Sequence, residues 1–114
     1  MIHIGKPFIC KENDRVKLVA KMVDEHQGID ENIYFETDAT WGEYFVDEVS
    51  DAFLLNAIMP AVKYGEDIEV DGAVSEQLYY NLNRYIIPLL SATYTPPTTY
   101  NLTHNLKVQS RMAI

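Results

Sequence analysis

Apolar and polar residues alternate near the start of the chain with the two-residue period of a strand buried on one face. The segment PFICKENDRVKLVAKMV, residues 7–23, contains two extended runs around the turn residues Asn13 and Asp14. It predicts a β-hairpin, and NIYFETD, residues 32–38, predicts a third short strand. The predicted buried positions of the second run are Val16, Leu18, Ala20 and Met22.

The pattern then changes to the three- and four-residue spacing of a helix. This helix is predicted to begin near Asp38 or Thr40, either of which can cap its opening turn, and to stop at Gly65. Pro60 is expected to bend or shorten the last turn, because proline lacks an amide donor and crowds the preceding turn. The predicted buried face consists of Val46, Val49, Phe53, Leu54, Ala57, Ile58, Ala61 and Val62.

The segment EDIEVDG, residues 66–72, alternates again and predicts a short strand with a carboxylate face and an apolar face. A second helix is predicted to start at Ser75, with Glu76 in the first turn where the helix dipole favours negative charge. Pro88 is expected to kink this helix or close it early. Its predicted apolar stripe consists of Leu78, Leu82, Tyr85, Ile86, Leu89 and Leu90.

The order of these elements predicts an α+β domain: a twisted, largely antiparallel sheet of four or five strands with two helices packed on one face. Residues 1–95 are predicted to form this single domain. Residues 96–114 are predicted to form an extended connector and one last strand in LKVQ, residues 106–109.

Charge is distributed unevenly along the chain. The 114 residues carry a formal net charge of −8, which divides into +2 over residues 1–24, −13 over residues 25–76 and +3 over residues 77–114. The acidic middle would repel a phosphate backbone, so direct binding of nucleic acid is not expected. It favours a basic protein partner or a second copy of the chain packed head to tail, unless it serves only solubility.

The start of the sequence lacks the long apolar core of a signal peptide, and its most apolar stretch, FLLNAIMPAV, is too short to span a membrane. The single cysteine, Cys10, cannot form a disulfide within the chain. These observations predict a cytoplasmic protein with no membrane association.

Two groups of residues are candidates for an interaction surface. Glu43, Asp47 and Asp51 are spaced four residues apart and would form an acidic stripe on the first predicted helix. A basic patch of a partner is the functional interpretation, and a solvated face is the alternative. Tyr79 and Tyr80 cannot both face the same core from one helix, so they suggest either an interface or a half-buried tyrosine.

Catalytic and cofactor motifs are missing from the sequence. It contains no glycine-rich phosphate loop and no G-x-S-x-G elbow, and the three histidines stand far apart, so no cofactor is expected. Asp67, Glu69 and Asp71 would lie on one face of their strand, where they could gather a hard cation or simply face water. They give the alternative function, a small metal-dependent enzyme that uses carboxylates.

A family resemblance rests on two segments, SDAFLLNAIMPAVKYG and DIEVDGAVSEQLYYNLNRYIIPLL, and extends to IHIGKPFICKENDRVKLVAKM before them. Together they resemble the N-terminal region of bacterial proteins that continue into an ATP-pyrophosphatase domain similar to 7-cyano-7-deazaguanine synthase. That family's Ser-Gly-Gly-x-Asp-Ser phosphate loop is not found in residues 96–114, so no catalytic residue carries over.

The resemblance implies a non-catalytic accessory or interaction domain, the N-terminal module of a nucleotide-activating protein. Its role would be substrate selection, dimerisation or shielding of the neighbouring active site. A free-standing homodimer is the remaining alternative.

Overall fold

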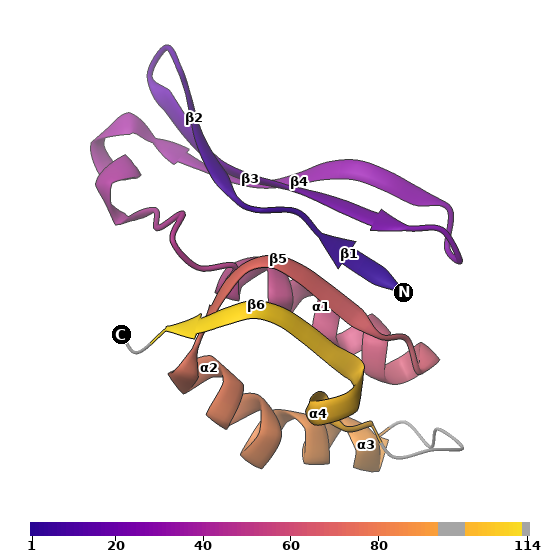
Figure 1. The fold of residues 1–114 in the computed structure, drawn as a ribbon. Coiled ribbons are helices and arrows are strands. Elements are labelled where there is room, and N and C mark those ends of the chain that lie inside the picture. The colour runs from indigo at the N-terminus through magenta and orange to yellow at the C-terminus, as the bar shows by residue number, and fades with distance from the viewer. Residues whose placement is uncertain (94–99, 113–114) are drawn as a thin grey trace.

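The computed structural model describes residues 1–93 and 100–112. Within them, six strands form one mixed sheet, and helices cover one of its faces (Figure 1). The strands are β1 (Ile2–Ile4), β2 (Phe8–Glu12), β3 (Arg15–Asp24), β4 (Ile29–Asp38), β5 (Ile68–Ser75) and β6 (Leu106–Met112). The helical elements are the 3₁₀ helix η1 (Ala39–Tyr44), α1 (Asp51–Tyr64), α2 (Glu76–Asn81), the π-helical turn η2 (Leu82–Ile86), α3 (Ile87–Thr93) and α4 (Leu102–Asn105).

The predicted hairpin is confirmed. β2 and β3 pair antiparallel on either side of a turn in which Asn13 adopts a left-handed φ of 52°, a conformation that asparagine tolerates better than most residues. β4 extends the hairpin by pairing along the whole length of β3. The alternating apolar residues of β3 are buried as predicted: Val16, Leu18, Ala20 and Met22.

The prediction of a largely antiparallel sheet of four or five strands holds in part, because the sheet of the described residues has six strands and is mixed. β1 pairs antiparallel with β3 on one side and parallel with β5 on the other, and β5 pairs parallel with β6. β5 and β6 can be parallel because helical elements lie between them in the sequence and return the chain to the end of the sheet where β5 began. β1 has only three residues and was not predicted.

The first long helix begins at Asp51, and the prediction of a start near Asp38 or Thr40 is wrong. Asp38 does cap a helix, but this is the six-residue η1. The chain is then held against β5, because Val49 forms a parallel bridge with Ala73 and the Ser50 amide donates to the Ala73 carbonyl at 2.8 Å. An extended backbone at this bridge cannot be helical, so α1 starts only after it.

The end of α1 agrees with the sequence more closely. The helix continues through Pro60 to Tyr64, so the proline does not shorten it. Gly65 follows in the left-handed conformation, with φ of 67°, and its amide donates to the Ala61 carbonyl as a C-cap. The buried face of α1 agrees with the predicted one from Phe53 onwards.

The second helical run has the predicted N-cap, but its buried face differs from the predicted one. Ser75 Oγ accepts from the Leu78 amide at 3.1 Å, as expected for an N-cap. The π-helical turn η2 lies directly before Pro88, whose ring would crowd the carbonyl one turn earlier in a regular helix. The wider turn changes the phase of the helix, so Ile87 is buried, whereas Tyr85 and Leu89, predicted to be apolar core, are 59% and 67% exposed.

The C-terminal strand is confirmed as β6, longer than the four predicted residues and paired with β5. Tyr100, Leu102 and Leu106 join the same core as α1 and β1. Residues 94–99, which include the start of the predicted connector, lie outside the described residues. In Figure 1, α1 lies behind β5, and the run from α2 to α3 lies beneath β6. None of the helices in the described residues is long and apolar enough to cross a membrane.

The contact between Asp51 and β5 predicts that Asp51 contributes more to the free energy of unfolding than the nearby Asp47 does. Asp51 accepts hydrogen bonds from the amide and the hydroxyl of the buried Ser75, at 2.8 and 2.5 Å, whereas Asp47 is exposed in the segment before the helix. We expect Asp51→Ala to lower the free energy of unfolding by about 2 kcal/mol, because it leaves buried donors without a charged acceptor. Asp47→Ala should change it by less than about 0.5 kcal/mol. Urea denaturation of both variants measures this, and equal effects would contradict it.

Candidate functional site

The predicted acidic stripe does not lie on one helix. Glu43 belongs to η1, Asp47 lies in the irregular segment that follows, and Asp51 is the first residue of α1. The four-residue spacing therefore does not place the three carboxylates on a common helical face. Their sequence neighbours instead surround a hollow in the surface, which residues 39–52 help to form.

This hollow has a volume of about 340 Å³ and is almost entirely apolar. It lies between the β3–β4 hairpin, the segment after η1 and the start of α1. Its walls are Leu18, Phe35, Tyr44, Phe45, Val46, Val49 and Ala52, together with Asp51. We call it the aromatic hollow.

Local packing explains why residues 39–50 form one side of the aromatic hollow. Gly42 lets η1 lie directly on β3, because a Cβ at this position would be 2.7 Å from Val16 Cγ2. The Val49 bridge to β5 fixes the other end of the segment. On the hairpin side, the Phe35 ring packs against the Phe53 ring of α1, with centroids 5.4 Å apart.

Large apolar side chains of this segment are exposed to water. Trp41, Tyr44 and Val46 are 58%, 68% and 49% exposed, and the rings of Trp41 and Tyr44 lie 6.0 Å apart. Isolated exposed apolar residues are ordinary, but several within six residues beside an apolar hollow are typical of an interaction surface.

The segment that forms one side of the aromatic hollow is acidic. Glu43, Asp47 and Glu48 are all exposed in the same segment. No lysine or arginine occurs between residues 25 and 62 of the sequence. This side of the aromatic hollow therefore combines apolar side chains with charge of a single sign, a combination that selects for a ligand with positive charge around an apolar group.

The two predicted tyrosines take different roles, and neither lines the aromatic hollow. Tyr79 packs against the core, and the Arg111 guanidinium lies over its ring at 4.4 Å. Tyr80 is 56% exposed. The inference that the pair cannot share one core is confirmed, because only Tyr79 packs against it.

The three carboxylates predicted to share one strand face, Asp67, Glu69 and Asp71, have different partners, and Asp67 lies just before β5. Asp67 accepts a hydrogen bond from Asn105 Nδ2 at 2.7 Å. Glu69 and Asp71 instead lie beside His3, whose Nε2 is 3.6 Å from Glu69 Oε1 and 2.8 Å from Asp71 Oδ1. In the sequence, His3 stands far from the other two histidines and from these carboxylates. Only the parallel pairing of β1 with β5 brings it to them.

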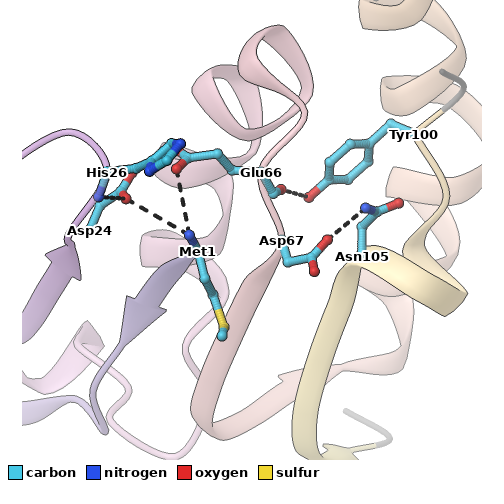
Figure 2. Close-up of polar contacts among 7 residues, drawn as sticks. All are labelled: Met1, Asp24, His26, Glu66, Asp67, Tyr100 and Asn105. Carbon is cyan, nitrogen blue, oxygen red and sulfur yellow. Dashed lines mark hydrogen bonds and ion pairs between the residues drawn. The ribbon is translucent and has the colours of Figure 1, made fainter. Parts of the chain in front are cut away.

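A second pair of carboxylates is buried. Asp24, at the end of β3, is 2% exposed, and Glu66, just before β5, is 7% exposed. Figure 2 shows both carboxylates on either side of the Met1 amino group, which lies 3.9 Å from Asp24 Oδ1 and 3.5 Å from Glu66 Oε1. The His26 amide also donates to Asp24 Oδ1, at 3.1 Å. Neither carboxylate oxygen of Glu66 has a hydrogen-bond partner among the described residues.

This environment favours the neutral form of Glu66. Burial and then the neighbouring Asp24 raise the pKa of Glu66, and the nearby ammonium lowers it by less. Burial also raises the pKa of the Tyr100 hydroxyl, which donates to the Glu66 carbonyl at 2.8 Å (Figure 2). The hydrogen bond to Asp24, the ion pairs with the Met1 amino group and the raised pKa of Glu66 together account for the buried pair.

Comparison of the chain with protein-family models, with curated proteins and with solved structures found no match. The resemblance to the ATP-pyrophosphatase family therefore stays a prediction from the sequence. Two features of the described residues suggest a function: the aromatic hollow, and the group of His3, Glu69 and Asp71, which we call the His3 cluster.

The raised pKa of Glu66 predicts a pH dependence of stability. Between the unfolded value, roughly 4.3, and the raised folded value, the folded state holds a proton that the unfolded state has lost. The free energy of unfolding should therefore fall as pH rises through this window. We expect Glu66→Gln to remove this contribution to the decrease in the free energy of unfolding, because glutamine does not ionise.

Urea denaturation at a series of pH values measures this prediction. Glu31→Gln, which changes an exposed carboxylate, is the matched control and should keep the wild-type profile. A Glu66→Gln profile that falls as steeply as the wild type over the same window would show that this carboxyl does not hold the proton.

Proposed function

We propose that this chain is a non-catalytic protein-interaction module that binds a basic segment of a protein partner at the aromatic hollow. The observation that carries the proposal is the apolar hollow beside the exposed Tyr44 and Val46, in a segment whose charged side chains are all acidic. An apolar side chain of the partner would enter the hollow, and flanking lysines or arginines would face Glu43 and Asp47.

The energetics of interfaces support this arrangement. Burying an exposed large apolar side chain contributes roughly 1.5–3 kcal/mol, and aromatic residues at the centre of an interface often dominate its affinity. The surrounding charges act differently: exposed ion pairs add little affinity, but they accelerate association and exclude acidic partners. The aromatic hollow would supply the affinity and the carboxylates the selectivity.

A basic partner fits this surface better than a second copy of the chain. In a symmetric dimer the same surface patch meets itself, which would place the acidic segments of both copies opposite one another. A head-to-tail arrangement avoids this only by pairing the segment with the mildly basic ends, +2 and +3 in formal charge. The homodimer is therefore the competing outcome.

The resemblance supplies a context for this module. We propose that it is the accessory N-terminal part of a cytoplasmic nucleotide-activating protein, as its likeness to proteins with an ATP-pyrophosphatase domain suggests. The native reading frame beyond Ile114 tests this part separately. A downstream Ser-Gly-Gly-x-Asp-Ser is expected, and a stop codon directly after residue 114 would remove the support for it.

Peptide binding tests the aromatic hollow. The probe is a fluorescein-labelled peptide with one phenylalanine flanked on each side by two lysines, and its anisotropy is followed as protein is added. We expect saturable binding that weakens with added salt, since exposed charges are screened. The double variant Tyr44→Ala, Val46→Asp should weaken binding at least about tenfold.

Two controls make the result specific. Tyr80→Ala removes a tyrosine of similar exposure away from the hollow and should leave the affinity unchanged. The same peptide with glutamate in place of lysine should not bind. Equal losses for both protein variants, or equal binding of both peptides, would contradict the proposal. Light scattering of the unliganded protein that shows a dimer lost on changing Tyr44 and Val46 would favour a second copy as the occupant.

A further inference from the structure

A side-chain cluster lies on the face of the sheet opposite the helices, away from the aromatic hollow. In β1 and β5 the even-numbered residues are buried beneath the helices, among them Ile2 and Ile68, so the odd-numbered residues face the other way. The parallel register pairs His3 with Glu69, and Asp71 lies two residues further along the same face. Adjacent strands therefore bring one imidazole and two carboxylates together.

The donor atoms of the cluster are close enough to share one ion. Nε2 of His3 lies 2.8 Å from Asp71 Oδ1 and 3.6 Å from Glu69 Oε1, and one donor atom of each residue lies within 4.8 Å of the other two. A tetrahedral cation with bonds of roughly 2.0–2.1 Å holds its ligands roughly 3.4 Å apart. Small side-chain rotations would meet this geometry without a change in the backbone.

The cluster is also open to solvent on both sides. His3, Glu69 and Asp71 are 38%, 43% and 49% exposed. One hollow beside them is lined by Glu69, Asp71 and Lys107, and a second by His3, Glu69 and Glu25. An ion could reach the three ligands from water and keep a water molecule as its remaining ligand.

We propose that His3, Glu69 and Asp71 bind one divalent transition-metal ion of the Zn²⁺ class. The imidazole distinguishes this cluster from a row of exposed carboxylates, because Mg²⁺ and Ca²⁺ prefer oxygen ligands alone, whereas Zn²⁺ takes nitrogen and oxygen together. Three protein ligands and one open position are the arrangement in which zinc keeps an exchangeable water.

The simpler interpretation is that His3 only forms a hydrogen bond with Asp71. The two interpretations differ in what each residue must do. A hydrogen bond needs one carboxylate beside the imidazole, whereas a metal site needs both carboxylates and the imidazole together. Loss of any of the three should then weaken metal binding.

Isothermal titration with ZnCl₂ on the purified chain tests the site, and cobalt substitution reports on it through visible absorption. We expect one ion per chain, with Mg²⁺ binding far more weakly. His3→Ala and Glu69→Gln should each weaken Zn²⁺ binding at least about tenfold. Both side chains are partly exposed, so circular dichroism should show that the variants stay folded.

Matched controls come from residues of the same types outside the cluster. His104→Ala changes an exposed histidine in α4, and Asp67→Asn changes the carboxylate just before β5 that is bonded to Asn105. Neither should alter the affinity or the stoichiometry. Binding that survives His3→Ala, or that falls equally with His104→Ala, would overturn the proposal. Failure of the metal site would leave the aromatic hollow unaffected, because the two share no residue.

Discussion

The fold depends on a strand of three residues. β1 joins the antiparallel hairpin to the parallel strands, since it pairs with β3 on one edge and with β5 on the other. Ile2 and Ile4 are almost fully buried beneath the helices and hold it there. The same short strand places His3 beside two carboxylates on the open face. Without this pairing, neither a single sheet nor the His3 cluster could form.

A second constraint determines where the aromatic hollow lies. The bridge between Val49 and Ala73 and the bonds from Ser75 to Asp51 fix the start of α1. Residues 39–50 must then cover the distance from the hairpin to β5 without being part of a long helix. Trp41 and Tyr44 lie in this segment with most of their surface in water, which is the physical origin of the proposed docking surface.

Local patterns in the sequence predicted much of the fold, and long-range pairings account for most of the errors. The alternation in β3, the Ser75 cap and the Gly65 stop depend on neighbouring residues and were correct. The start of α1 was wrong because a bridge to β5, more than twenty residues away, overrides helical spacing. Ile87 is buried instead of Leu89 because of a π-helical turn, which the spacing of apolar residues in the sequence does not predict.

The difference between local patterns and long-range pairings also explains why the sequence did not predict the candidate sites. Spacing alone could not place Glu43 and Asp47 beside an apolar hollow, and strand order was needed to bring His3 to Glu69. The net charge of −8 also conceals two populations of carboxylates. Asp24 and Glu66 are buried, and burial raises the pKa of Glu66. The carboxylates near the aromatic hollow and on the open face are partly or fully exposed, and both proposed ligands are cationic because such carboxylates attract positive charge.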